Sequence, residues 1–171
     1  KLSKTAKKIG AVNCITISKK KKLKGYNTDY HGFKKSIQPL LKDHHKKALI
    51  LGTGGASKAI AYALRKLKIE YDFVSRTADE FQYKYEELDA SIFEEYTIII
   101  NTTPVGTHPN VDDCPNLDYS LFTKKHIAYD LIYNPEETAF LRKAKAQGAV
   151  TKNGYEMLVL QAEKAWKIWN E

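Results

Sequence analysis

The sequence has few cysteines, no long apolar run and no low-complexity tract, and each shortage excludes a class of protein. Two cysteines, Cys14 and Cys114, cannot form a disulfide framework, so we expect a reducing, cytoplasmic compartment. The most apolar runs, Ala48–Leu51 and Thr97–Ile100, have the length of strands. A membrane-spanning helix needs ~20 apolar residues, so we expect no membrane association. The first residues contain no apolar signal segment, and nothing in the chain indicates a metal site.

The chain is basic, with a formal net charge of +8 over 171 residues. One interpretation is a nucleic-acid-binding face, and the other is a positive field that attracts small anionic ligands. The densest lysine run, Lys19–Lys22 with Lys24, lies between two short segments that alternate like the strands of a hairpin. No aromatic side chains for base stacking are interleaved with it, so we expect a solvated hairpin tip and no nucleic-acid partner.

The most informative segment is ALILGTGGASKA at residues 48–59. A buried strand runs into glycines, and a segment with helical apolar spacing follows, which is the setting of a dinucleotide-binding turn. Glycines let the backbone approach a pyrophosphate, and the amides that open the helix face the anion. The residues expected to bind the cofactor here are Gly52, Gly54, Gly55 and Ala56. The alternative is a tight turn between strand and helix that binds no ligand.

Strand and helix patterns alternate along the rest of the chain. We expect strands at 48–51, 71–74, 97–100, 126–131 and 149–150, and helices at 1–9, 29–41, 55–67, 138–147 and 155–169. This alternation predicts the α/β class, with a Rossmann-like, doubly wound parallel sheet and helices on both faces.

The end of the second predicted strand indicates which cofactor binds. An NAD-binding fold usually has an acidic residue there, which accepts a hydrogen bond from the ribose 2′-hydroxyl. This chain has Ser75, Arg76 and Thr77 instead. A guanidinium and two hydroxyls suit a 2′-phosphate, so NADP is the predicted cofactor. The alternative is an arginine that merely stands at a strand end.

Five segments resemble the shikimate dehydrogenase family in order and spacing. They are Gly10–Asn13, Asn27–Asp29, the glycine turn at 52–56, Asn101–Gly106, and Asn153–Gly154 with Met157, Leu158 and Gln161. The resemblance extends from Ala6 to the last helix. It implies an oxidoreductase of the shikimate pathway, in aromatic amino-acid and chorismate biosynthesis, which reduces 3-dehydroshikimate reversibly to shikimate with NADPH.

The resemblance also implies remnants of a second α/β domain that binds substrate, and with them a division of the chain into three parts. Residues 1–28 would be the end of the substrate domain, 29–153 the NADP-binding domain, and 154–171 a terminal helix that packs back toward the substrate domain. The family's catalytic lysine would lie in an N-terminal part that this sequence does not contain. We therefore expect these 171 residues to bind cofactor and to be inactive alone. The family includes both monomers and homodimers.

Residue by residue, the resemblance assigns Asp29 as the catalytic carboxylate. It assigns substrate binding to Asn13, Asp29, Tyr133 and Gln161. The cofactor contacts that it adds to the glycine turn and to Ser75–Thr77 are Thr102, Thr103, Leu131, Gly154, Met157 and Leu158. Taken without the family, Asp29 is most simply a helix N-cap, Gln161 a polar residue on an amphipathic helix, and Tyr133 a turn aromatic.

Two alternatives to this function stay open at the level of sequence. One keeps the enzyme class but changes the ligands, as a quinate/shikimate dehydrogenase or a paralogue that prefers NAD. The other is a non-catalytic basic module that binds nucleic acid. Arg76 distinguishes the first alternative, because only a 2′-phosphate needs its charge. Salt-dependent duplex binding would distinguish the second.

Overall fold

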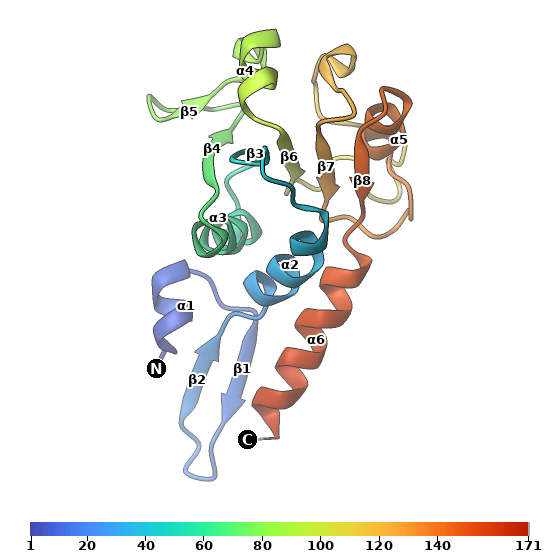
Figure 1. Cartoon of the computed structure of the whole chain (residues 1–171). Coiled ribbons are helices and arrows are strands. Elements are labelled where there is room, and N and C mark those ends of the chain that lie inside the picture. Colours follow the sequence, from blue (N-terminus) through green and yellow to red (C-terminus); the bar gives the residue numbers. More distant parts are fainter. Residues whose placement is uncertain (171) are drawn as a thin grey trace.

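A six-stranded, wholly parallel sheet forms the centre of the protein in a computed structural model, which describes residues 1–170 (Figure 1). Its strands are β3 (Lys47–Leu51), β4 (Glu70–Val74), β5 (Gln82–Tyr83), β6 (Ile98–Asn101), β7 (Ile127–Asp130) and β8 (Val150–Lys152). They are arranged in the order β5-β4-β3-β6-β7-β8. This is the strand order of dinucleotide-binding folds, whose ligands bind where the order reverses, here between β3 and β6.

Helices cover both faces of the sheet, so the predicted fold class is confirmed. Side chains alternate along each strand, and in β3 this sends Ala48 and Ile50 to one face and Leu49 and Leu51 to the other. The first face packs against α2 (Asp29–Ile37) and α3 (Gly55–Leu67). The second face packs against α4 (Ala90–Glu95), α5 (Ala139–Ala146) and the short 3-10 helix η3 (Tyr119–Leu121).

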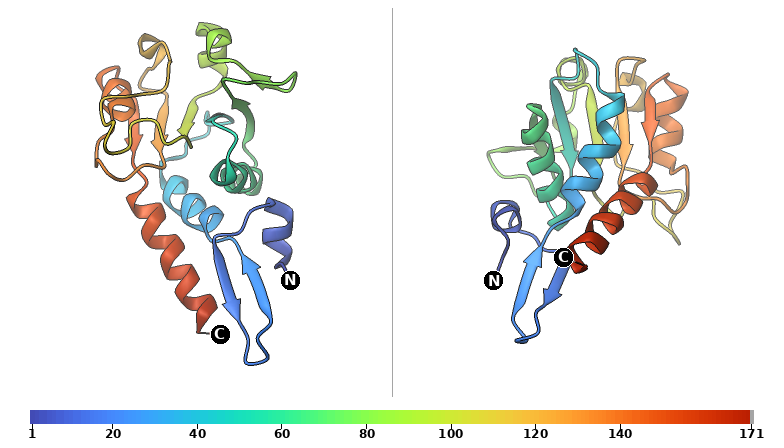
Figure 2. Two further views of the ribbon diagram at one scale, coloured as in Figure 1. Left: turned by 180° about the vertical axis from the view of Figure 1, so that it is seen from behind. Right: turned by 60° about the horizontal axis from the view of Figure 1, so that its bottom comes forward.

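The two ends of the chain meet beyond the carboxyl edge of the sheet. Helix α1 (Lys4–Ile9) is followed by an antiparallel hairpin of β1 (Cys14–Ile17) and β2 (Leu23–Tyr26). Helix α6 (Tyr155–Trp169) starts at the sheet and extends to this hairpin, as Figure 1 and both views of Figure 2 show. There the indole Nε1 of Trp169 donates a hydrogen bond of 3.0 Å to the carbonyl of Ile15.

A glycine lets α6 cross α2 at close range. A Cβ placed on Gly32 would lie 2.4 Å from the backbone oxygen of Met157 and 3.2 Å from the Cβ of Gln161. Only a residue without a side chain fits this crossing. The position of α6 therefore depends on the glycine in the middle of α2.

Three details of the sequence prediction are wrong. The N-cap of α2 is Thr28, and Asp29 is the first helical residue, so Asp29 does not cap the helix. The helix ends at Ile37 and not at Leu41, because Pro39 has no amide hydrogen, and the 3-10 turn η1 (Gln38–Leu40) follows. The first helix begins at Lys4 and not at Lys1, because the side chain of Ser3 caps it by accepting from the amide of Ala6. In the loop before β3, His45 is buried, and its ring bonds the backbone at Lys42 and Lys125.

Other elements agree with the sequence prediction to within a few residues. Helix α6 has the predicted bounds, and α3 ends at the predicted residue. Helix α4 was not predicted, because its segment is short and rich in charge; Asp89 caps it through the amide of Ile92. None of the helices described is both long enough and apolar enough to cross a membrane.

Candidate functional site

The glycine turn lies at the reversal of strand order, between β3 and α3. Gly52 has a φ of +98°, a conformation that side-chain-bearing residues rarely adopt. Its amide donates to the carbonyl of Val74 at 2.8 Å, which ties the turn to the end of β4. A Cβ on Gly52 would lie 2.9 Å from Cγ2 of Thr103, so the turn also packs directly against the loop after β6.

Gly54 and Gly55 have open space where a side chain would be. No heavy atom lies within 4 Å of a Cβ built on either residue, and both are exposed. Gly54 is the N-cap of α3 and supplies no side chain to its free amides. These amides at the start of a helix of 13 residues can therefore receive an anion from outside. Ala56 is half-buried, whereas Ala59 is fully buried and packs in a small cluster with Ile9 and Tyr62.

Arg76 lies in the turn that follows β4. Its guanidinium is exposed, and within residues 1–170 it takes part in no ion pair or side-chain hydrogen bond. Ser75 is buried, and its hydroxyl accepts from the amide of Thr77 at 3.2 Å, which shapes the turn. The carboxylate of Asp79 bonds Phe81 and Gln82 and is thus engaged within its own turn. A cation without a partner stands beside the glycine turn.

Thr102 and Thr103 follow β6 on the other side of the glycine turn. The hydroxyl of Thr102 donates to the carbonyl of Leu51 at 2.6 Å, which joins the ends of β6 and β3. The hydroxyl of Thr103 donates at 2.6 Å to the amide oxygen of Asn101, which is buried. Both threonines are half-buried, at the edge where ligands bind in such sheets.

A second group of polar side chains assembles from three distant segments. The amide nitrogen of Asn13 donates to Asp29 Oδ1 at 2.7 Å and to Thr28 Oγ1 at 3.0 Å, and it lies 3.5 Å from Oε1 of Gln161. Thr28 closes the group, because its hydroxyl donates to Gln161 Oε1 at 3.0 Å. Three of the four residues predicted to bind substrate are thus neighbours. We call Asn13, Thr28, Asp29 and Gln161 the polar cluster.

The carboxylate of Asp29 has a perturbed acidity. Partial burial raises its pKa above the usual value, and the hydrogen bond from Asn13 offsets part of that effect. A carboxyl group whose pKa moves toward neutrality is better suited to proton transfer. The location and the acidity of Asp29 are therefore compatible with its predicted catalytic role.

Helix α6 runs from the loop after β7 to the polar cluster. Gly154 is buried, and a Cβ there would lie 1.9 Å from the carbonyl oxygen of Leu131. The seven steps from Gly154 to Gln161 correspond to a rise of ~10 Å along the helix axis. Leu131 and Leu158 are half-buried, whereas Met157 is 7% exposed and packs in the core, so most of its surface contacts protein.

Tyr133 is the predicted substrate residue that the structure does not place in the polar cluster. It lies in the loop after β7 with 49% of its surface exposed, and its hydroxyl makes no hydrogen bond within residues 1–170. Sequence reasoning missed the structural roles of Thr28, Asn101 and Asp130. The signal for all three was present, since each is a polar residue at the boundary of an apolar strand or a helix.

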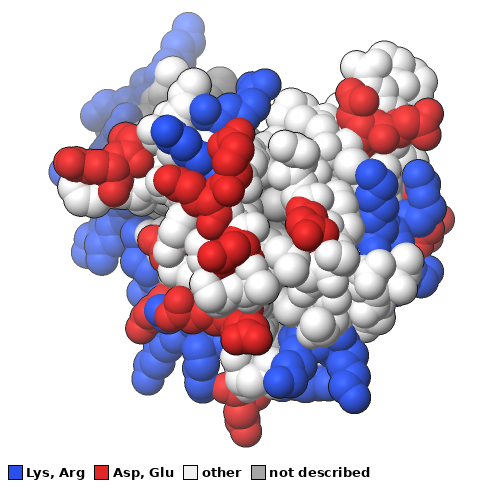
Figure 3. Space-filling view, turned by 90° about the horizontal axis from the view of Figure 1, so that it is seen from above, with Lys and Arg blue, Asp and Glu red and all other residues white. Residues whose placement is uncertain are grey.

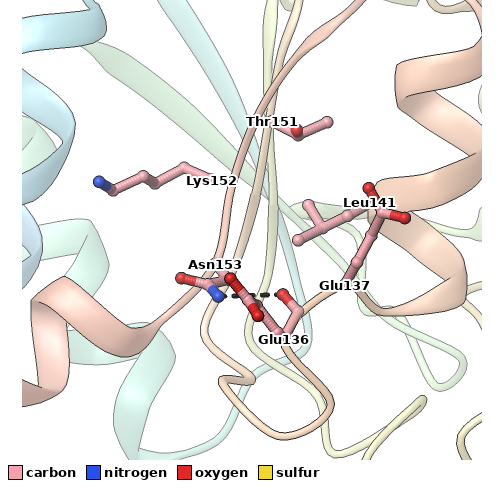
Figure 4. Close-up of a pocket in the computed structure, with 6 residues that line it drawn as sticks. All are labelled: Glu136, Glu137, Leu141, Thr151, Lys152 and Asn153. Atoms are coloured by element: carbon pink, nitrogen blue, oxygen red, sulfur yellow. Dashed lines mark hydrogen bonds between the residues drawn. The ribbon is translucent and has the colours of Figure 1, made fainter.

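Two surface hollows lie away from these residues. One, of about 410 Å³, lies between α5 and β8 and is lined by Glu136, Glu137, Leu141, Thr151, Lys152 and Asn153 (Figure 4). The other, of about 630 Å³, lies on the outer side of α6 around Trp166 and Trp169. Neither contains a predicted site residue. Within the described part of the chain, no three His, Cys, Asp or Glu residues are grouped to hold a metal ion.

The residues around the glycine turn fit a phosphorylated dinucleotide. The open backbone at Gly54 and Gly55 leaves room for a pyrophosphate, and Arg76 offers an unpaired charge near the end of β4. The face of the molecule that is farthest from the hairpin carries acidic and basic side chains side by side (Figure 3). Such a mixed face does not offer an extended surface of one sign.

Comparison with known proteins extends the likeness to nearly the whole of this chain. The chain is 40% identical, over 98% of its length, to the shikimate dehydrogenase (NADP(+)) of Caldanaerobacter subterraneus subsp. tengcongensis, and it covers 65% of that protein. It thus spans about two thirds of the length of such relatives. No protein-family model matches it.

Solved structures agree with this likeness. Shikimate dehydrogenase from Aquifex aeolicus matches with a TM-score of 0.84 at 37% identity, over 99% of this chain and 65% of that one. The enzyme from Thermus thermophilus, in complex with NADP(H) and shikimate, matches with a TM-score of 0.83 at 34% identity, over 98% of this chain and 65% of that one. A quinate dehydrogenase from Corynebacterium glutamicum in complex with NAD matches with a TM-score of 0.84 at 26% identity, over 98% of this chain and 65% of that one.

Proposed function

We propose, from the homology of this chain with shikimate dehydrogenases along nearly its whole length, that it is the NADP-binding portion of such an enzyme. The reaction proposed for the whole protein is the NADPH-dependent, reversible reduction of 3-dehydroshikimate to shikimate. The chain covers 65% of the relative from C. subterraneus, so this activity is attributed to the protein of which these residues are a part.

One observation carries this proposal. An exposed glycine turn with an unpaired arginine after the neighbouring strand occurs in one chain with the polar cluster, which includes Asn13, Asp29 and Gln161. A nucleotide-binding turn alone is common to many dehydrogenases. The Asp29 carboxylate, with the side-chain amides of Asn13 and Gln161 beside it, supports an enzyme that holds a polar, hydroxylated substrate next to its cofactor.

Different residues of the chain are proposed to bind the cofactor, orient the substrate and exchange the proton. The amides at the start of α3 would hold the pyrophosphate, and Arg76 with Ser75 and Thr77 would hold the 2′-phosphate. The bound cofactor would supply a hydride. Asn13 and Gln161 are placed to orient substrate hydroxyls, and Asp29, with its raised pKa, is placed to exchange the proton of the reacting hydroxyl.

Cofactor binding can be tested on the 171-residue chain itself. We expect NADPH to bind more tightly than NADH in isothermal titration calorimetry, with no measurable shikimate oxidation. Arg76→Ala should weaken NADPH binding by about 1–3 kcal/mol, which is roughly 5- to 150-fold, and leave NADH binding nearly unchanged. Arg142→Ala is the matched control, because Arg142 is an exposed arginine on α5, far from the turn. Equal losses for both cofactors, or no NADPH binding at all, would refute the proposal.

The same titration examines the alternative ligands. A paralogue that prefers NAD would bind NADH at least as tightly as NADPH and would be insensitive to Arg76→Ala. The match to a quinate dehydrogenase in complex with NAD makes this comparison necessary. Exposed Arg76, with Asp79 engaged within its own turn, favours NADP.

We also propose that the chain has no nucleic-acid partner and works in a reducing, cytoplasmic compartment. Both cysteines are free thiols, and the lysines of the hairpin tip are exposed, without aromatic side chains among them. A nucleic-acid-binding module would bind a DNA duplex with an affinity that falls steeply with salt. We expect no such binding in a fluorescence-anisotropy titration at physiological ionic strength.

A further inference from the structure

Asp130 is a buried carboxylate at the carboxyl end of β7, and none of the predicted site roles uses it. It is fully buried and accepts three hydrogen bonds. The donors are the amide nitrogen of Asn101 at 3.1 Å, the backbone amide of Ile132 at 3.0 Å and the hydroxyl of Thr138 at 2.7 Å. Within residues 1–170 no lysine or arginine pairs with it.

Asn101 transmits the position of Asp130 to the loop beside the glycine turn. Its amide oxygen accepts from the backbone amide of Thr103 at 3.0 Å and from the hydroxyl of Thr103 at 2.6 Å. An ionised carboxylate accepts hydrogen bonds only, so the NH₂ end of the Asn101 amide must face Asp130. The oxygen end is then held toward Thr103. The carboxylate of Asp130 and the carbonyl of Val105, which accepts from the same nitrogen at 3.3 Å, together determine which way the Asn101 amide points.

The effect reaches the cofactor-binding surface through packing. The Cγ2 atom of Thr103 lies 2.9 Å from the place where a Cβ on Gly52 would be, so this loop and the glycine turn have little freedom to shift independently. On the other side, Thr138 caps α5 through the amide of Leu141. Asp130 therefore connects β7, α5 and the loop that holds Thr102 and Thr103.

The ionised state of Asp130 is unfavourable for stability. Burial raises the pKa of its carboxyl to about 6, and the hydrogen bonds from Thr138, Ile132 and Asn101 offset only part of that effect. Because the pKa is higher in the folded state, the unfolding free energy falls as pH rises through the range from the unfolded value to about 6. The titratable side chain that senses this charge is Tyr119 of η3, whose pKa is raised by burial first and by Cys114 and Asp130 to a smaller degree.

We propose that Asp130 is a positioning residue for the cofactor: in its ionised form it orients Asn101, which holds Thr103 and its loop in the arrangement that binds NADPH. This inference depends on the proposed function. The ionised carboxylate of Asp130 lowers the stability of the fold, yet it accepts three hydrogen bonds. The orientation that it gives to Asn101, and through Asn101 to Thr103, accounts for its presence. On protonation, one carboxyl oxygen becomes a donor. The amides of Asn101 and Ile132 can only donate, so among its three partners only the hydroxyl of Thr138 can accept from it.

The test is the pH dependence of NADPH affinity in the wild-type chain and in Asp130→Asn. We expect Asp130→Asn to weaken NADPH about tenfold near neutral pH, as for the loss of a hydrogen bond to a charged group. The wild-type affinity should fall as pH falls below about 6, and this fall should be smaller in Asp130→Asn. The 2′-phosphate of NADPH also titrates near pH ~6, so the decisive quantity is the difference between the two proteins.

Tyr129→Phe is the matched control. Tyr129 precedes Asp130 on β7, is equally buried and bonds Ser36 through its hydroxyl at 2.6 Å, but it packs on the face toward α2. The Tyr129→Phe variant should keep both the NADPH affinity and the pH profile of the wild type. If circular dichroism shows that Asp130→Asn does not fold, Thr138→Val is the decisive variant. Loss of the Thr138 hydroxyl raises the pKa of Asp130 further, so the fall in NADPH affinity on acidification (the acid limb) should begin at higher pH. Thr138→Ser keeps a hydroxyl and should restore the wild-type profile.

The outcomes separate the two proposals. Binding of NADPH by the wild type with an unchanged affinity and pH profile in Asp130→Asn overturns the positioning role alone. The same holds if Thr138→Val leaves the acid limb where it was. A wild-type chain that does not bind NADPH at any pH overturns the proposed function, and the positioning role with it.

Discussion

Two glycines of the same turn should respond to alanine in opposite ways. At Gly52 the φ of +98° is unfavourable for alanine, and the new Cβ would lie 2.9 Å from Cγ2 and 3.2 Å from Oγ1 of neighbouring threonines. At Gly55, the first residue of α3, the φ is not positive and the Cβ meets no atom within 4 Å. The first glycine is needed for the fold, and the second is needed only if a ligand approaches the backbone.

The magnitudes follow from these contacts. Left-handed strain costs about 1–2 kcal/mol and overpacking about 1–3 kcal/mol, so Gly52→Ala should lower the unfolding free energy by about 2–5 kcal/mol. For a chain of this size that lowers Tm by roughly 5–15 °C. Gly55→Ala restricts the unfolded chain without strain, so it should raise stability by about 0.4–1 kcal/mol.

Ligand binding should show the reverse for Gly55. A methyl group there occupies the space left for the pyrophosphate, so NADPH affinity should fall at least about tenfold, or 1.4 kcal/mol, although the protein is more stable. Differential scanning calorimetry with and without NADPH measures both effects on one sample, since a ligand raises Tm only if it binds. A Gly55→Ala protein that binds NADPH as well as the wild type would contradict the assignment of this turn to a nucleotide.

Three further outcomes are expected. Gly154→Ala should destabilise the protein by several kcal/mol, because its Cβ would lie 1.9 Å from the Leu131 carbonyl; a Tm within about 2 °C of wild type would contradict the packing described. Gly32→Ala should displace α6 from α2 and change the fluorescence of the tryptophans on α6, because its Cβ would lie 2.4 Å from a backbone oxygen; unchanged emission and Tm would oppose this. Burial lowers the pKa of His45 and of His126 below the usual value, and Nδ1 of each ring accepts a backbone amide. Their contribution to stability is therefore present above the unfolded pKa of about 6.5 and is lost as pH falls through that value and below. The unfolding free energy, measured by chemical denaturation from about pH 7 to 5, should decline with falling pH, and the decline should be shallower in His45→Asn. Equal slopes in the two proteins would refute this.

Local sequence was sufficient for most of the secondary structure. Helix α6 follows from apolar spacing and has its predicted bounds, and Gly10 ends α1 with a φ of +75°. Propensity was insufficient near residue 38, where Pro39 ended the helix early, and at Asp29, where Thr28 took the capping position. His45 also could not be assigned, because its burial depends on the loop before β7, about 80 residues later in the chain.

The sequence by itself determined the glycine turn, the arginine after β4 and the order of strands and helices, because each depends on residues that are close together in the chain. Only the tertiary structure decided that Asn13, Asp29 and Gln161 meet. Asn13 and Gln161 are separated by 148 residues, and they become neighbours because Gly32 lets α6 lie against α2. Likewise, Asp130 and Asn101 are ordinary polar residues in the sequence, and they become a connected pair only where two parallel strands end side by side. Contacts of this kind depend on packing between distant segments, which no local pattern specifies.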